Sequence, residues 1–181
     1  MRGEVTKYDE IADLALVKVA QIPSGRNPLR LGDTEEISVG ADVHAIGHPT
    51  GQEWTYTTGV ISQYRIGAEW TIENVKHKAD VIQTQTPINP GNSGGPLISD
   101  SSTLIGINTF NQRDAQGLNF AIAVDEVKKF LTRKGNRSAE GIVAQNKNAC
   151  EPKQVGSWRD KNSQANIYGY DTNCSGKNMP I

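Results

Sequence analysis

Between residues 3 and 123 the chain is divided into short apolar stretches separated by turn-forming residues. Apolar and polar side chains alternate in these stretches, which is the pattern of half-buried strands, and Gly, Pro, Asn or Asp stand between them. Many short strands of this kind predict an all-β barrel or sandwich. The expected strands are 14–19, 43–46, 55–62, 81–86, 104–110 and 118–124.

A single helix is expected over residues 125–134, after the last strand. Val127, Phe130 and Leu131 fall on one helical face at spacings of three and four. Asp125 is expected to cap the first turn, and Gly135 to stand just beyond the last turn.

The five residues 91–95, Gly-Asn-Ser-Gly-Gly, carry the clearest chemical signal. Glycine permits the positive φ angles of a tight turn and leaves backbone N–H groups uncovered. Such groups can converge on the oxygen of a reacting carbonyl, with the Ser93 hydroxyl beside them as a nucleophile. By themselves, the five residues fit a glycine-rich hairpin equally well.

The segment 82–97 around this motif resembles the nucleophile segment of trypsin-like serine proteases of the HtrA/Deg type. Five further segments resemble the same family in the same order: 13–19, 39–51, 58–62, 104–109 and 118–123. The resemblance implies a chymotrypsin-like fold, with a complete C-terminal barrel, a remnant of the N-terminal barrel and a short C-terminal helix. It assigns residues 1–135 to an N-terminally truncated protease domain.

The resemblance also implies roles for individual residues. Ser93 matches the nucleophile, and Asp13 matches the carboxylate that orients the catalytic histidine. The oxyanion hole is implied at Gly91, Asn92 and Ser93, where Asn92 shapes the loop. The residues implied to bind substrate, with a preference for small to medium aliphatic side chains, are Ile88, Asn89, Pro90, Thr109, Leu118 and Ala121.

The family histidine lies upstream of Asp13, in a segment that this sequence does not contain. His44, His48 and His77 match no catalytic position of the family, and each is expected to be an ordinary surface or turn histidine. The polypeptide is therefore predicted to carry a nucleophile and an orienting acid without a base between them, and to be inactive alone.

Two functions remain open at this point. One is a serine endopeptidase that cleaves unfolded or extended polypeptides, and the other is a non-catalytic relative that binds such peptides at a sheet edge. An esterase is a weaker third reading. The spacing of residues 91–95 fits Gly-x-Ser-x-Gly, but the all-β pattern lacks the strand-to-helix turn of that motif.

Charge and composition limit the classes of molecule that the chain is expected to bind. The formal net charge is −1 and there is no basic block, which argues against nucleic acid or an anionic membrane surface. No stretch approaches the roughly 18 apolar residues of a membrane-spanning helix. A polypeptide substrate is expected, with no metal or organic cofactor. The missing first strands also predict self-association, or association with a separate N-terminal segment.

Residues 136–181 are rich in Asn, Gln, Ser and Gly and are predicted to form a polar tail. Cys150 and Cys174, the only cysteines, both lie there. They are a candidate disulfide that would close this tail, and two free thiols are the alternative. A disulfide suits an exported protein, so it favours, with the family resemblance, a periplasmic or secreted location.

Overall fold

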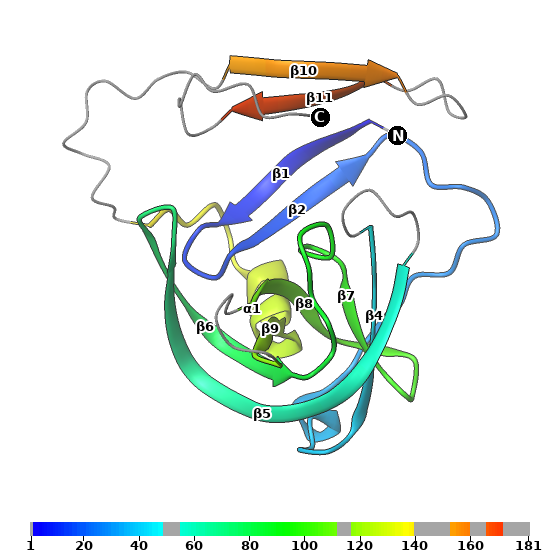
Figure 1. Ribbon diagram of the computed structural model, residues 1–181, viewed down its shortest axis with the longest axis vertical. Coiled ribbons are helices and arrows are strands. Elements are labelled where there is room, and N and C mark those ends of the chain that lie inside the picture. Colours follow the sequence, from blue (N-terminus) through cyan, green and yellow to red (C-terminus); the bar gives the residue numbers. More distant parts are fainter. Residues whose placement is uncertain (1, 49–54, 112–116, 140–152, 160–165, 172–181) are drawn as a thin grey trace. The chain divides into compact units, whose positions relative to one another are not determined.

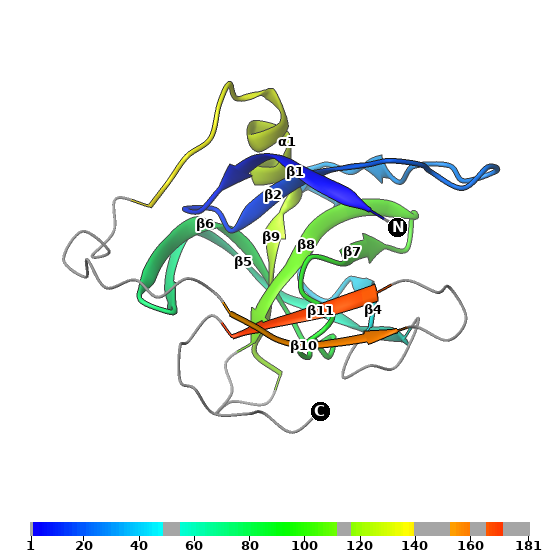
Figure 2. The same cartoon turned by 90° about the horizontal axis from the view of Figure 1, so that it is seen from above.

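The computed structural model describes residues 2–48, 55–111, 117–139, 153–159 and 166–171. The chain divides into two compact units, one spanning Arg2–Gly141 and the other Ile142–Ile181. The larger unit contains a closed ring of antiparallel strands, seen nearly end-on in Figure 1 and from a second direction in Figure 2. It also contains a separate two-stranded hairpin and one helix.

Six strands form the ring, in the order β4, β5, β6, β9, β8, β7, with β7 pairing back onto β4. A short strand, β3, joins β8 in parallel, and a turn of 3-10 helix, η1, follows it. The bounds are β3 Arg30–Leu31, η1 Thr34–Glu36, β4 Asp42–Gly47, β5 Thr55–Ile72, β6 Val75–Thr84, β7 Pro96–Ser99, β8 Thr103–Asn111 and β9 Asn119–Ala123. Since the ring is closed, each of these six strands has two neighbours, although some of the pairings cover only part of a strand.

The interior of the ring is filled by side chains that alternate along its strands. Val43 and Ala45 point inward from β4 and are almost completely buried. They pack in one cluster with Ile61, Ile82, Leu97, Ile105, Ala121 and Ala123. The alternation visible in the sequence therefore gives each strand one face for the barrel core.

A hairpin of β1 (Gly3–Asp9) and β2 (Leu14–Val19) forms its own two-stranded sheet. Its turn packs against the helix α1 (Val124–Thr132), where Ala12 and Leu14 meet Val127 and Phe130. The end of the hairpin away from this turn is more exposed to solvent. Val5 is 56% exposed and Val17, its partner across the hairpin, 49%.

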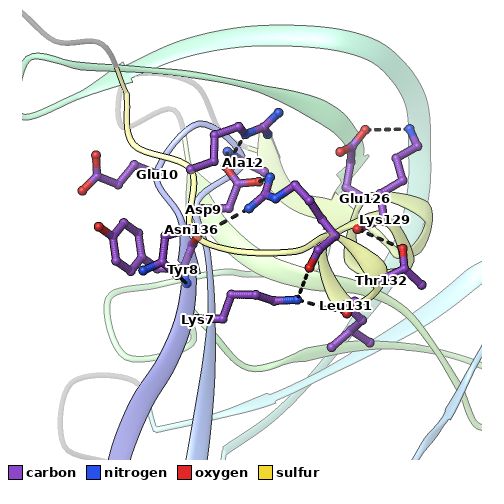
Figure 3. A network of polar contacts seen from close by, with 12 residues as sticks. Lys7, Tyr8, Asp9, Glu10, Ala12, Glu126, Lys129, Leu131, Thr132 and Asn136 are labelled. Carbon is purple, nitrogen blue, oxygen red and sulfur yellow. Dashed lines mark hydrogen bonds and ion pairs between the residues drawn. The ribbon is translucent and has the colours of Figure 1, made fainter.

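Asp9 fastens the hairpin to the segment that follows α1 (Figure 3). Its carboxylate is buried and accepts hydrogen bonds from Arg133 Nη1 at 2.5 Å, from Arg137 Nε at 2.8 Å and from the Ala12 N–H at 3.0 Å. Lys7 Nζ adds hydrogen bonds to the Leu131 and Arg133 carbonyl oxygens, both at 3.0 Å. Residues more than 120 positions apart thus hold this end of the hairpin in place.

The all-β barrel with a short C-terminal helix is confirmed. The helix differs in detail from the prediction, because it begins at Val124 and its N-cap is Ala123. Asp125 lies inside the first turn, where its side chain accepts a hydrogen bond from the Thr34 hydroxyl. A carboxylate is favourable there through the helix dipole, so the N-cap prediction mistook a first-turn acid for the capping residue.

The smaller unit contains an antiparallel hairpin, β10 (Lys153–Arg159) and β11 (Asn166–Asp171). The sequence predicted no strands in this polar segment. Cys150 and Cys174 lie outside the described residues. No helix in the described part of the chain is long and apolar enough to cross a membrane.

Candidate active site

The serine predicted to be the nucleophile is exposed on a loop between β6 and β7. Gly91 adopts a φ of 105°, a conformation that L side chains rarely take. A Cβ atom at Gly95 would lie 2.5 Å from the Ile46 carbonyl oxygen, so only glycine fits where this loop passes β4. The loop that presents Ser93 therefore depends on these two glycines.

Two buried asparagines hold the loop that carries Ser93 in place through hydrogen bonds. Asn108 of β8 accepts from the Gly94 N–H at 2.8 Å and donates its own N–H to the Gly95 carbonyl oxygen at 2.9 Å. Its side-chain Nδ2 donates to the Pro96 carbonyl oxygen at 3.2 Å. Asn92 is 1% exposed and donates from Nδ2 to the Pro87 carbonyl oxygen at 3.3 Å. Ser93 is thereby fixed relative to β8.

Backbone donors are free where an oxyanion hole is expected. Among the described residues, neither the Gly91 N–H nor the Ser93 N–H donates a backbone hydrogen bond. The Asn92 N–H, in contrast, already donates to the Asn89 carbonyl oxygen at 2.9 Å. Of the three residues predicted for the hole, Gly91 and Ser93 thus have backbone N–H groups without a partner among the described residues, whereas the N–H of Asn92 is already bonded.

Thr109 joins the two catalytic candidates. Its hydroxyl donates to Asp13 Oδ2, and its backbone carbonyl oxygen accepts a hydrogen bond from Ser93 Oγ at 2.7 Å. Acid and nucleophile thus both contact one residue of β8, and both line a cleft of about 700 Å³. The sequence had placed Thr109 among substrate-binding residues, and no motif marked this bridging role.

The turn between β1 and β2 carries Asp13, which is exposed and has a φ of 54°. This turn is tied to β6 by two hydrogen bonds. The Lys78 N–H donates to the Ile11 carbonyl oxygen at 2.8 Å, and His77 Nδ1 donates to the Glu10 carbonyl oxygen at 2.7 Å. Asp13 is therefore positioned by the barrel as well as by its own hairpin.

The three histidines occupy different environments. His44 lies on β4, where Tyr56 Oη is 2.6 Å from its Nδ1 and Asp100 Oδ1 is 2.7 Å from its Nε2. His48 is exposed next to the nucleophile loop. The expectation of an ordinary surface position is wrong for His77, which is 8% exposed, stacks on Trp70 and lines the cleft of Ser93 and Asp13. The strand register of β6 turns it inward, which the polar sequence around it concealed.

None of these histidines makes a hydrogen bond to Ser93 or Asp13 within the described part of the chain. Nor do the described residues contain a group of three or more His, Cys, Asp or Glu side chains suited to a metal ion.

The residues implied to bind substrate are only partly brought together. Asn89 and Pro90 are exposed on the nucleophile loop, and Ile88 is buried beneath them. Leu118 lies apart from the Ser93 cleft, in a second cavity. Ala121 is fully buried in the barrel core, which leaves it no surface for a substrate.

Comparison with known proteins agrees with this geometry. The family described as "Trypsin-like peptidase domain" matches residues 1–107. Serine protease PepD of Mycobacterium tuberculosis is 37% identical over 159 residues, covering 78% of this chain and 34% of PepD. Serine protease HTRA1 of Xenopus laevis is 40% identical over 141 residues, covering 77% and 29%. The chain spans about a third of the length of these relatives.

Solved structures lead to the same family. The HtrA-type protease AlgW, solved with a tripeptide, superposes with a TM-score of 0.61 at 33% identity, covering 71% of this chain and 42% of AlgW. The serine endoprotease from Yersinia pestis superposes with a TM-score of 0.57 at 27% identity, covering 71% and 42%. With the Ser93 loop, the Asp13 turn and the closed barrel, these matches show that the chain belongs to the trypsin-like peptidase family, as a serine protease of the HtrA type.

Proposed function

We propose that the chain provides the nucleophile, the oxyanion hole and the orienting acid of a serine endopeptidase that cleaves extended polypeptides. The Thr109 bridge supports this most strongly, because it holds Asp13 and Ser93 on one residue. In the proposed mechanism, Ser93 Oγ attacks the scissile carbonyl carbon. The Gly91 and Ser93 N–H groups then stabilise the oxyanion, each contributing about 3 kcal/mol.

A histidine must complete this mechanism. Its ring has to take the Ser93 proton and transfer it to the leaving amine, while Asp13 stabilises the charged ring. Since His44, His48 and His77 make no such contacts and are the only histidines of the sequence, we propose that another polypeptide segment supplies this base. Removal of a catalytic histidine lowers kcat by a factor on the order of 10⁶, so the isolated polypeptide should be nearly inactive.

This proposal predicts the outcome of a hydrolysis assay on the pure polypeptide. A chromogenic peptide should show no turnover above that of the Ser93→Ala variant. Free imidazole, added in increasing concentration, should restore slow turnover because it can occupy the space between Ser93 and Asp13. Asp13→Asn should reduce this rescued rate, since it removes the charge that stabilises imidazolium.

Two results would contradict the proposal in different ways. Serine-dependent turnover at ordinary protease rates without imidazole would mean that His44, His48 or His77 serves as the base. A complete lack of rescue would favour the second candidate, a non-catalytic domain that binds peptides. The absence of hydrogen bonds from any of these histidines to Ser93 is the observation that favours this candidate.

A further inference from the structure

A second cavity lies beside the strand that carries Thr109. It has a volume of about 450 Å³ and lies between the outer part of the β5–β6 hairpin and strands β8 and β9. Aromatic and aliphatic side chains line most of it, among them Trp70, Ile72, Phe110, Leu118 and Phe120. The size is that of a small-molecule or side-chain site.

The aromatic rings of this cavity form a continuous stack. Phe110 lies between Trp70, at a centroid distance of 4.9 Å, and Phe120, at 4.6 Å, with interplanar angles of 25° and 17°. Trp70 also stacks on His77 at 5.3 Å. None of the three cavity aromatics is fully buried, so the stack keeps apolar surface that a further ring can cover.

The rim of the cavity is polar. Arg65 donates from Nε and Nη2 to Gln83 Oε1 at 2.8 and 2.6 Å. Glu69 is paired with Lys78 at 2.7 Å. These side chains are satisfied by each other, which leaves the apolar floor as the surface available to a ligand.

The neighbouring backbone indicates which ligand can reach this floor. The antiparallel pairing of β7 with β8 ends at Pro96 and Ile107, and Gly94 and Gly95 continue it on Asn108. Beyond Asn108, no described strand pairs with β8 on this side. A peptide that extends this ladder runs antiparallel to β8 and therefore towards Ser93.

Side chains that face each other across an antiparallel pair lie on the same side of the sheet. The peptide residue beside Phe110 consequently directs its side chain to the face where the Phe110 ring lines the cavity. Because the peptide runs towards Ser93, this residue precedes the one whose carbonyl group reaches the nucleophile.

We propose that this cavity is a specificity site for an aromatic side chain upstream of the scissile bond of an extended polypeptide substrate. The inference rests on the proposed function only in taking its substrate class, an extended polypeptide. The site would add a preference for an aromatic side chain at a second substrate position, separate from the one next to Ser93.

Peptide binding to the unaltered polypeptide tests the proposal without any catalysis. The probes are blocked hexapeptides that end in valine, with phenylalanine at each of the three preceding positions in turn, and an otherwise identical peptide with alanine there. Binding is followed by NMR through the Trp70 indole N–H resonance, which is assigned by its loss in Trp70→Phe. At least one phenylalanine peptide should bind about tenfold or more tightly than the alanine peptide and should shift this resonance.

Two variants locate the effect. Trp70→Ala should remove the preference for phenylalanine, whereas Tyr56→Ala, which removes an exposed aromatic ring elsewhere on β5, should retain it. If Trp70→Ala does not fold, the shift of the Trp70 resonance in the unaltered protein decides the question.

Equal affinity of the phenylalanine and alanine peptides would overturn the proposal. So would no binding of either peptide, a preference that leaves the Trp70 resonance in place, or a preference that survives in folded Trp70→Ala. If the protein prefers phenylalanine but shows no imidazole rescue, the specificity site is supported and the proposed catalytic function is not. If imidazole restores turnover but phenylalanine is not preferred, the catalytic function is supported and the specificity site is not.

Discussion

Asp9 shows how one buried carboxylate stabilises a hairpin that has little core of its own. Burial alone would raise the pKa of Asp9, but hydrogen bonds from Arg137, the Ala12 N–H and Arg133 outweigh it and hold this pKa below its usual range. The stabilisation belongs to the charged form, so it is complete above the unfolded-state pKa of 3.8 and is lost as the pH falls through the lower folded-state value.

Asp9→Asn should destabilise the folded protein by about 2–4 kcal/mol, because it leaves two arginines without their carboxylate. Asp42→Asn, a change of the same kind at an exposed position on β4, is the control and should leave stability nearly unchanged. Thermal melts at pH 7 and pH 3 provide the measurement. An equal loss for both variants at pH 7 would show that the Asp9 network contributes nothing specific.

Several residues of the site were predictable because their backbone requirements are written in the sequence. Gly91 and Gly95 identify a loop that few other residues can form. Ser93 lies between them, so the sequence marks it as the residue that this loop presents. The roles of Thr109 and His77 were not predictable, since each depends on a strand register that joins residues distant in sequence. For Ala121, the match to a family position gave no sign that its side chain is fully buried in the core.

At the scale of elements, β6 supports the hairpin that carries Asp13. His77→Phe preserves the stack on Trp70 but removes the donor to the Glu10 carbonyl oxygen. We expect a loss of about 1–3 kcal/mol and faster hydrogen exchange at the Lys78 amide, which bonds the same turn. His48→Phe, at an exposed position, is the control. Unchanged exchange at Lys78 would refute a supporting role for His77.

Five of the six barrel strands were predictable, because apolar alternation marks them, whereas β7 (Pro96–Ser99) was not among the expected strands. Their lengths were less so. β5 continues to Ile72 and β6 begins at Val75, well beyond the expected 55–62 and 81–86. The extra residues pair with each other in a long hairpin where few side chains are buried. On the β6 side of this hairpin burial alternates, since His77 and Ala79 are buried and the lysines beside them are exposed, but a buried histidine interrupts the apolar pattern.

At the scale of the whole molecule, the hairpin β1–β2 leaves apolar surface uncovered. Val5, Val17 and Val19 are between 37% and 56% exposed, and Ile22 beyond them is 69% exposed. Full burial of such a side chain contributes about 1.5–3 kcal/mol. We expect the polypeptide alone to self-associate, or to bind a separate segment that covers this face.

Analytical ultracentrifugation at micromolar concentration tests this expectation. Val5→Ser combined with Val17→Ser should shift the protein towards the monomer, whereas the same changes at two exposed polar positions, Thr58→Ser and Lys76→Ser, should not. A monomer that melts cooperatively without any partner would falsify the expectation.

The smaller unit offers a second prediction at this scale. Its hairpin pairs Lys153 with Asp171, and the only two cysteines of the sequence, Cys150 and Cys174, lie outside the described residues. We expect these cysteines to form a disulfide under oxidising conditions, which would contribute about 3 kcal/mol by closing a loop of roughly 25 residues. Mass spectrometry of the unreduced protein decides, and two free thiols after oxidative refolding would contradict the pairing.

The contact of Thr109 with both Asp13 and Ser93 has a mechanical consequence. Two separate loops carry these residues, yet both make a hydrogen bond to the same residue of a barrel strand. If both hydrogen bonds persist, a displacement of β8 should carry acid and nucleophile with it. The imidazole ring that binds between Asp13 and Ser93 should therefore find them at a similar distance from each other, even when the outer parts of the two loops move.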